Sequence, residues 1–428
     1  MAADALASAA AVARVSPLQA LHYDLSRTGG LAPVAAPPYD VIDGQQRAAL
    51  LARSPHNAVA IDLPDDPAGG DPYAHAAAML ASWRDQGIVV RDREPALWAI
   101  EQDYAGPDGR RRTRHGIFAR VAIEDYGPGR IRPHERTHPG PREDRLRLTR
   151  ATKANLSPIF SLYDGDAWSP LAPHVEDEPP FGELTDDDGT THRLWRVGDP
   201  DAIAAAQAAL APAELLIADG HHRYETARVY ADEVGGDGPH RHVLMCLVSL
   251  ADPGLTIFPT HRLLTGLDEQ RRTALREAIR RDWEVEEIPG DELEPAPNGR
   301  IRIGYLDAHH RRPLRLTLKD PAIADAALPG KPPAYRRLDT AVTEALLLEG
   351  ALGMTEDDIS HLRGLDYARS TAEARERVSG GDVQAGLFMG PAPVELVREV
   401  AAAGEVMPPK STYFFPKVLT GLLFNPLA

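Results

Sequence analysis

The chain has 428 residues, 43% hydrophobic and 26% charged, values typical of a soluble globular protein of two or three domains. Its 47 Lys and Arg against 63 Asp and Glu give a formal net charge of −16, which argues against duplex nucleic acid as a partner because counterion release needs a basic face. Apolar runs fall short of the ~20 residues that span a bilayer. The start, with Asp4 near Met1, lacks the basic region of a secretory signal. We therefore expect a cytoplasmic protein without a membrane partner.

The first region, residues 18–164, predicts an extended segment, a helix and a hairpin. Ala36–Ile42 is expected to be rigid and extended because each X-Pro step disfavours helix. Apolar residues at helical spacing predict a helix over Asp71–Gln86. Ala96–Tyr104 and Thr113–Val121 flank a turn at Pro107–Gly109 and predict a β-hairpin.

The second region, residues 190–264, alternates helix and strand, and an acidic stretch, Glu176–Asp188, precedes it as a predicted solvated loop. The lone cysteine, Cys246, excludes an internal disulfide and a Cys-rich zinc site, and its apolar neighbours predict a buried, unreactive thiol. The predicted elements are helices at Ala202–Leu210 and His222–Glu233 and strands at Glu214–Ala218, His242–Leu250 and Leu255–Pro259.

The third region begins near Asp268 and again mixes strands with helices, with a Gly/Asp break at Gly380–Asp382. Together the three regions predict an α+β or mixed α/β fold. The predicted elements are strands at Arg300–Leu306, Pro313–Leu318 and Gln384–Met389 and helices at Arg337–Glu349 and Val394–Ala402.

The strongest candidate site is the run Asp219-Gly220-His221-His222-Arg223, between a predicted buried strand and a helix. The first N–H groups of a helix lack intrahelical partners, and the macrodipole favours an anion there. Arg223 offers a planar fork for phosphate oxygens, the histidines are donors, and Asp219 can hold a metal or accept a proton. The alternative is a purely structural role, in which Asp219 caps the helix and the histidines are surface residues.

A second candidate is the basic stretch of residues 132–155, which gathers seven Lys or Arg side chains in an otherwise acidic chain. Such clustering indicates a phosphate or carboxylate ligand. A salt-bridged helical face is equally compatible, since Glu143 and Asp144 precede Arg147 by four and three residues. Both interpretations stay open.

The third candidate is the stiff, aromatic segment of residues 407–417, which contains Lys410, Ser411 and Thr412. It is expected to pack back on the protein and to bring these groups to a ligand, although a docked tail without a ligand fits equally well. It lacks the Gly-rich loop of a P-loop NTPase. Thr260–Arg262 and Pro37–Asp40 are weaker candidates, for which core or turn roles are favoured.

Five blocks of the sequence together resemble the bacterial domain-of-unknown-function family 1015, over nearly the whole chain. One block, Asp219-Gly-His-His-Arg-Tyr-Glu, is also similar to the phosphate motif of the ParB/sulfiredoxin superfamily, in which free-serine kinases carry Asp-Gly-His-His-Arg. Because sulfiredoxin's cysteine is His221 here, sulfinic-acid reduction is not expected. The five blocks are Pro37–Val41, residues 134–160, Asp219–Ala227, Pro259–Arg262 and residues 407–414.

The resemblance implies a ParB/sulfiredoxin-like nucleotide-binding core with a large insertion over residues 15–265, and a C-terminal α+β domain over residues 266–428. It further implies that His222 and Arg223 contact nucleotide phosphates and that Asp219 lies near the metal or the acceptor hydroxyl. The kinase's catalytic glutamate corresponds to Glu135 or Glu143, and the motifs do not decide between them.

The leading hypothesis is a kinase that uses ATP or ADP with Mg²⁺ to phosphorylate a small hydroxyl metabolite, free L-serine first of all. The alternatives are a phosphoserine-consuming reaction at the same site, and a nucleotide-binding regulatory or DNA-associated protein without turnover. The predicted catalytic residues are Asp219, His221 and Glu135, with Asp219 also the metal ligand. The predicted phosphate ligands are Gly220, His222, Arg223, Thr226, Arg145, Lys153, Lys410, Ser411 and Thr412.

Overall fold

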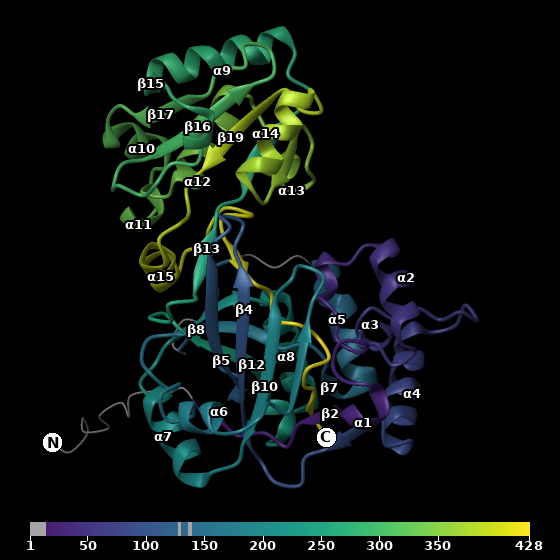
Figure 1. Ribbon diagram of the computed structural model, residues 1–428. Helices are drawn as coiled ribbons and strands as arrows, with labels where there is room; N and C mark the ends of the chain where they lie inside the picture. The colour runs from purple at the N-terminus through teal and green to yellow at the C-terminus, as the bar shows by residue number, and fades with distance from the viewer. Residues whose placement is uncertain (1–13, 127–129, 136–138) are drawn as a thin grey trace, which may run out of the picture. The chain divides into compact units, whose positions relative to one another are not determined.

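The computed structural model describes residues 14–126, 130–135 and 139–428, which form two compact units (Figure 1). The first unit contains the described residues up to Gly106, then Arg110–Leu255 and Pro416–Ala428, and the second contains Pro107–Gly109 and Thr256–Phe415. The boundary between the two units lies after Leu255, ahead of the expected domain boundary between residues 265 and 266. It lies there because residues 256–264 pair with strands of the second unit. The residues compared with a secretory signal lie outside the described part.

The first unit is built on a mixed sheet, to which the described residues contribute nine strands. The strands are β1 (Val15–Ser16), β4 (Leu97–Ala105), β5 (Arg111–Ala122), β6 (Ile131–Arg132), β8 (Ile159–Tyr163), β9 (Gly182–Thr185), β10 (Thr191–Val197), β11 (Leu215–Asp219) and β12 (His242–Ser249). Their order is β6-β11-β8-β12-β5-β4-β10-β9, with β1 beside β5. The β6/β11 and β8/β12 pairs are parallel, and the other pairs are antiparallel.

The hairpin predicted from sequence is confirmed as β4 and β5, paired from Trp98↔Phe118 to Ala105↔Arg111. Strand β8 is buried at every position, as in strands covered on both faces. The expected loop at residues 176–188 is wrong in part, because β9 pairs with β10 and buries Leu184. A single buried residue in an acidic run is too weak a pattern to reveal a short edge strand.

Helices lie on both sides of this sheet, and α2, α3, α4 and α5 gather on one side of it in Figure 1. The predicted helix at 71–86 is confirmed as α4, whose first turn Asp71 caps through its carboxylate. The helical segments are α1 (Leu25–Thr28), η1 (Tyr39–Val41), α2 (Gly44–Arg53), α3 (Val59–Asp62), α4 (Pro72–Asp85), α5 (Pro139–Thr152), α6 (Ala172–Glu176), α7 (Pro200–Leu210), α8 (His221–Val234) and η2 (Pro239–Arg241).

Residues Pro416–Ala428, which we call the C-terminal arm, return to the first unit and run along it in yellow in Figure 1. Thr420 forms a backbone bridge with Ala36, and Phe424, fully buried, forms one with Leu21. At its end, β21 (Asn425–Pro426) pairs with β7 (Ala154–Asn155). A further small pair joins β2 (Leu21–Tyr23) to β3 (Val89–Arg91). The arm is therefore part of the first unit's core.

The second unit has an antiparallel sheet, six-stranded over the described residues, in the order β15-β17-β16-β19-β14-β18. These strands are Trp283–Glu287 (β15), Leu314–Leu318 (β17), Arg302–Asp307 (β16), Ala385–Met389 (β19), His261–Leu264 (β14) and Leu365–Ala368 (β18); β13 (Thr256–Phe258) pairs separately with β20 (Tyr413–Phe415). The helical segments are α9 (Glu269–Asp282), η3 (Gly290–Glu292), α10 (Pro321–Ala327), α11 (Pro333–Arg336), α12 (Asp339–Thr343), η4 (Glu344–Ala351), α13 (Glu356–Ser360), α14 (Thr371–Gly380) and α15 (Val394–Ala402).

Two sequence-based expectations for local structure need correction. The predicted helix at 337–349 is a short α-helix, α12, followed by a π-helical segment, η4, that ends at Ala351. The Pro-rich segment 36–42 is not extended throughout, because Tyr39–Val41 forms a 3₁₀ turn after Pro38. The rule that residues before proline are extended restricts Ala36 and Pro37, and it does not restrict the residues that follow Pro38.

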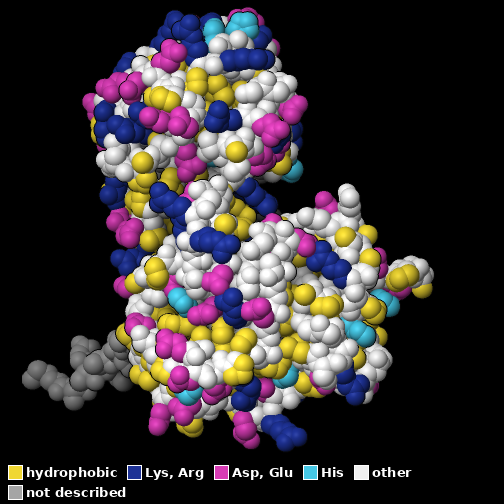
Figure 2. Space-filling model, viewed as in Figure 1, with side chains coloured by type: hydrophobic (Ala, Val, Ile, Leu, Met, Phe, Trp, Pro, Cys, Tyr) yellow, Lys and Arg dark blue, Asp and Glu magenta, His cyan; other side chains and the backbone are white. Residues whose placement is uncertain are grey.

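The surface of the molecule carries charges of both signs. On the face drawn in Figure 2, Lys and Arg side chains are interspersed with Asp and Glu side chains. Over the described residues, no helix combines the length and apolar character required to cross a bilayer.

Candidate anion site

The candidate site is the corner where β11 ends and α8 begins. Gly220 joins the two elements with φ 99°, a left-handed conformation that residues with a Cβ rarely adopt. A Cβ at Gly220 would also lie 3.0 Å from Nε of Arg223. Gly220 is the N-cap of α8, and no side chain caps the first turn. Asp219 does not cap this helix, so the alternative in which Asp219 serves only as a helix cap is wrong. The backbone N–H groups of the first turn of α8 are therefore not bonded to a capping side chain.

Each carboxylate oxygen of Asp219 accepts a hydrogen bond from a cationic side chain. Oδ1 accepts from Nζ of Lys417 at 2.7 Å, and Oδ2 accepts from Nη2 of Arg223 at 2.7 Å. Burial raises the pKa of Asp219, but the charges of Lys417 and Arg223 outweigh it and hold the pKa well below its ordinary value. Asp219 is therefore a fixed carboxylate, better suited to positioning cations than to accepting a proton.

Arg223 reaches back from the first turn of α8 across the corner. Its Nη1 donates to the backbone carbonyl of Pro158, and its side chain is 11% exposed. Burial lowers the pKa of Arg223, whereas Asp219 and then Asp40 and Tyr39 raise it, so that the guanidinium stays charged. The structure thus brings the Pro37–Asp40 block, a weak candidate by itself, next to the phosphate motif.

Two buried imidazoles, His134 and His221, lie against each other beside the corner, with ring centroids 4.7 Å apart. His134 Nδ1 lies 2.6 Å from the carbonyl of Ile217 and donates to it, since a carbonyl only accepts. His221 Nε2 accepts from the backbone N–H of His134 at 3.3 Å, so its proton is on Nδ1, 3.8 Å from a carboxylate oxygen of Glu135.

Both imidazoles are neutral at pH 7. Burial lowers the pKa of His134 to about 4, although the carbonyl of Ile217 acts in the opposite direction. Burial, followed by the neighbouring His134, lowers the pKa of His221 well below its ordinary value. The carboxylate of Glu135 is 45% exposed, so the predicted pair of Glu135 and His221 joins a buried imidazole to a solvent-facing acid.

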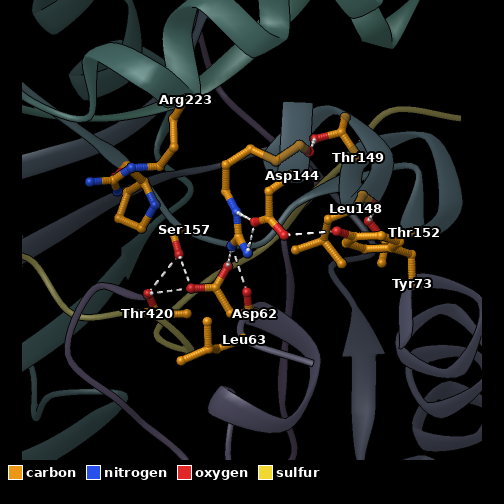
Figure 3. Close-up of polar contacts among 12 residues, drawn as sticks. Asp62, Leu63, Tyr73, Asp144, Leu148, Thr149, Thr152, Ser157, Arg223 and Thr420 are labelled. Atoms are coloured by element: carbon orange, nitrogen blue, oxygen red, sulfur yellow. Dashed lines mark hydrogen bonds and ion pairs between the residues drawn. The ribbon is translucent and has the colours of Figure 1, made fainter. Parts of the chain in front are cut away.

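A second polar cluster, which the sequence did not single out, surrounds the buried carboxylate of Asp62. Oδ2 of Asp62 accepts from Ser157 at 2.9 Å and from Thr420 of the C-terminal arm at 3.5 Å, and these groups point toward one another in Figure 3. Nη1 of Arg145 donates to the backbone carbonyl of Asp62 at 2.5 Å. The guanidinium of Arg145 also stacks on Tyr39, 4.1 Å from the ring centroid.

A small cavity of about 40 Å³ lies between these groups, lined among others by Asp62, Arg145, Arg223 and Thr226. A cavity of this size has room for water molecules but not for a nucleoside. Arg145, Arg223 and Thr226, three of the predicted phosphate ligands, therefore share one cavity, and Gly220 and His222 lie in the adjacent turn.

The basic stretch of residues 132–155 is largely the helix α5. Arg147 pairs with Glu143 at 3.0 Å, as the salt-bridged alternative predicted, and Arg150 also pairs with Glu233 of α8 at 2.6 Å. Arg145 is different, because it is buried and turned to the cavity. Lys153 is exposed at the end of α5 with φ 51°. Residues 136–138 of this stretch lie outside the described residues.

Lys410, Ser411 and Thr412 belong to the second unit. Ser411 is buried; its hydroxyl donates to the Pro408 carbonyl at 2.7 Å, and its oxygen lies 3.1 Å from the Thr340 hydroxyl. The carbonyl of Lys410 accepts from Arg262 at 3.3 Å. Their role as phosphate ligands stays a prediction.

Lys417 is a cation of the corner that the sequence did not single out. It ends the same 407–417 segment from which Lys410 was selected, and it contacts Asp219. In the sequence, Lys417 directly follows a proline in a stiff segment, and so does Lys410. Nothing in the sequence alone indicated which of the two lysines lies at the corner.

The residues present do not fit a protein-held Mg²⁺ at Asp219, because both of its oxygens already bind cations. Among the described residues, no group of three His, Cys, Asp or Glu side chains could hold a metal ion. The corner fits an anion instead, since the helix N-terminus, Arg223 and Lys417 all favour negative charge.

Two minor sequence predictions are confirmed. Cys246 is buried in β12, and burial raises the pKa of its thiol to about 12, as expected for an unreactive cysteine. His261 and Arg262 are core residues of the second unit: His261 Nδ1 accepts from the Met389 N–H at 3.1 Å, and Arg262 binds the Thr260 carbonyl at 2.6 Å.

Fold and site together define a mixed α+β protein with a strand–helix corner suited to an anion. The family model described as "Protein of unknown function (DUF1015)" matches residues 15–341, more than three quarters of the chain. The chain belongs to this family, and the resemblance inferred from its motifs is confirmed. No curated protein matches it.

Among solved structures, the chain is 14% identical to a free serine kinase variant in complex with AMP, over 67% of this chain and 84% of that one, with a TM-score of 0.35. It is also 14% identical to a conserved hypothetical protein from Pyrococcus furiosus, over 68% of this chain and 92% of that one, with a TM-score of 0.34. It is 12% identical to SbnI with a C-terminal truncation from Staphylococcus aureus, over 71% of this chain and 85% of that one, with a TM-score of 0.35. TM-scores this low mark a distant likeness. The α+β class is confirmed by the strands and helices of the structure itself, and the ParB/sulfiredoxin-like core stays a prediction.

Proposed function

We propose that this protein is a nucleotide-dependent phosphotransferase that phosphorylates a small hydroxyl metabolite, with free L-serine as the first acceptor to test. The observation that carries the proposal is the corner at Asp219–Arg223, where an uncapped helix N-terminus meets two cations. Phosphoryl transfer depends mainly on positioning and on stabilising charge around the phosphorus, and such a corner supplies both.

In this proposal, the α8 N-terminus, His222 and Arg223 hold the phosphates of ATP or ADP. The acceptor hydroxyl oxygen attacks the terminal phosphorus, the bond from that phosphorus to the nucleotide oxygen breaks, and the hydroxyl proton passes to a base. Glu135 is the base we favour, because its carboxylate is partly exposed and faces the Nδ1–H of His221. Any Mg²⁺ would arrive with the nucleotide, since Asp219 is occupied by cations.

The direct test incubates the purified protein with ATP or ADP, Mg²⁺ and L-serine and detects O-phosphoserine by mass spectrometry. We expect product in the wild type and a loss of at least 100-fold in Glu135→Gln, the usual range for a general base. Glu143→Gln is the matched control, because Glu143 lies on the exposed face of α5 and pairs with Arg147. The absence of phosphorylated product with serine and with related hydroxyl metabolites would refute the kinase.

A further inference from the structure

We infer that Lys417, carried by the C-terminal arm, is a direct ligand of the anion bound at the strand–helix corner. The arm then supplies part of the binding site as well as part of the core. The inference rests on the proposed function only for the identity of the anion, a nucleotide phosphate.

The position of the Lys417 ammonium is the first observation. It lies 2.7 Å from one oxygen of Asp219, whose other oxygen lies 2.7 Å from Arg223, so both cations flank one carboxylate. An ammonium has three donors, and a bond to Asp219 is compatible with a bond to a phosphate oxygen. The side chains of Lys417 and Arg223 are 23% and 11% exposed, so an anion from solvent can reach both.

The backbone around Lys417 is held by a buried network, which is the second observation. Nη2 of Arg114 donates to the carbonyl of Pro416 at 2.6 Å, and Nε2 of Gln102 donates to the carbonyl of Lys417 at 3.2 Å. Arg114 in turn donates from Nε to Oε1 of Gln102 at 3.0 Å. Two consecutive carbonyls of the arm are therefore fixed by side chains of β4 and β5.

The network continues away from the arm through Gln102, which lies 3.2 Å from Nδ1 of His192, and through His192 to Asp186 at 2.8 Å. The guanidinium of Arg114 is fully buried and stacks on Phe160, 4.5 Å from the ring centroid. Burial lowers the pKa of Arg114 only to about 10, so it stays charged. A buried charge adds little net stability but fixes geometry, which identifies Arg114 and Gln102 as positioning residues for Lys417.

Further anchors hold the arm beyond Lys417, notably the backbone bridge of Thr420 with Ala36 and the buried ring of Phe424. A lysine on such a fixed backbone loses less freedom on binding than one on a mobile tail. This preorganisation distinguishes Lys417 from an ordinary surface ion pair, which contributes little.

The first test measures binding of ADP and of inorganic pyrophosphate by titration calorimetry to the wild type, Lys417→Gln and Lys319→Gln. Lys319 is an exposed lysine of the second unit and serves as the control. We expect at least tenfold weaker binding of both ligands to Lys417→Gln and unchanged binding to Lys319→Gln. Equal affinity of the folded Lys417→Gln variant and the wild type would overturn the inference and leave the proposed function intact.

A second test needs no substitution and so remains decisive if Lys417→Gln does not fold. The wild type is acetylated with acetic anhydride with and without saturating pyrophosphate, and each lysine is quantified by mass spectrometry. We expect pyrophosphate to slow acetylation of Lys417 severalfold and to leave Lys319 unchanged. Bound pyrophosphate without protection of Lys417 contradicts the inference alone, whereas a wild type that binds neither ADP nor pyrophosphate contradicts the proposed function as well.

The positioning role is tested with Gln102→Leu, which removes the donor to the Lys417 carbonyl. We expect weaker pyrophosphate binding together with faster acetylation of Lys417 in the absence of ligand, because the ammonium is no longer held at Asp219. A purely structural role of Gln102 would lower the melting temperature and leave the reactivity of Lys417 in the folded protein unchanged.

Discussion

At the scale of single residues, the site is a balance between burial and charge. Asp219 is buried and yet a carboxylate because two cations bind it, and His134 is buried and neutral because the charge of Asp219 does not offset the desolvation of the imidazole. The two cases divide the corner into a charged part, with Arg223 and Lys417, and a neutral part, with His134 and His221.

The neutral imidazole of His134 predicts a loss of stability in mild acid. Its folded pKa of about 4 lies below the ordinary value of 6.5, so unfolding takes up a proton between these values and stability falls as the pH falls through this window. From pH 7 to pH 5 the contribution of His134 to this loss is about 2 kcal/mol. Urea unfolding should show this decrease in the wild type and a decrease smaller by about that amount in His134→Gln. The same pH dependence in both proteins would contradict the assignment.

The sequence predicted the residues of the charged part incompletely. Asp219, His222 and Arg223 lie within five consecutive residues, so a local motif revealed them. Lys417 and Asp62 come to the corner only through tertiary packing, one from the C-terminal arm and one from the end of α3. A single sequence contains no signal for such long-range proximity.

At the scale of elements, the β11–Gly220–α8 turn determines where the anion donors point. Gly220→Ala adds a left-handed non-glycine residue, costing about 1–2 kcal/mol, and brings a Cβ to 3.0 Å from Nε of Arg223. We expect roughly tenfold weaker nucleotide binding by titration calorimetry. Gly109→Ala is the control, because Gly109 has φ 74° but open space around its Cβ position. Equal loss of affinity in the two variants would show that general strain, and not the corner, is responsible.

Most elements could be predicted because each has a strong local pattern. Helix α4 has helical apolar spacing with Asp71 as a cap, and β4 and β5 flank a Pro-Asp-Gly turn. The exceptions are elements whose formation depends on distant partners. Strand β9 forms by pairing with β10, and η4 departs from α-helical geometry within a continuous leucine-rich run.

At the scale of the whole molecule, the chain order does not follow the units, since the C-terminal arm returns to the first unit after the second. The sequence placed a domain boundary near residue 265 but assigned residues 416–428 to the C-terminal domain. An apolar, Pro-rich end predicted docking without indicating on which unit. The arm's position depends on the complementary surface, which a single sequence does not reveal.

The arm's burial predicts a selective effect of Phe424→Ala on the first unit. Phe424 is fully buried in that unit, and its ring centroid lies 5.7 Å from that of Tyr23. Truncation of a buried phenylalanine to alanine costs about 3–5 kcal/mol of folding stability. Hydrogen exchange should show faster exchange in β4 and β5 and unchanged exchange in β16 and β19. Phe388→Ala, in the core of the second unit, should give the opposite pattern. Uniform acceleration throughout the chain would contradict the division into units.

If the Asp219–Arg223 corner binds a nucleotide phosphate, as we propose, loss of the Arg223 guanidinium must weaken nucleotide binding, and calorimetric titration of ADP into the wild type and Arg223→Ala measures this. Arg228→Ala is the control, because Arg228 lies on the same helix and pairs with Asp125 away from the corner. We expect binding in the wild type and in Arg228→Ala and at least a tenfold loss of affinity in Arg223→Ala. Undiminished ADP binding by Arg223→Ala would contradict the proposal.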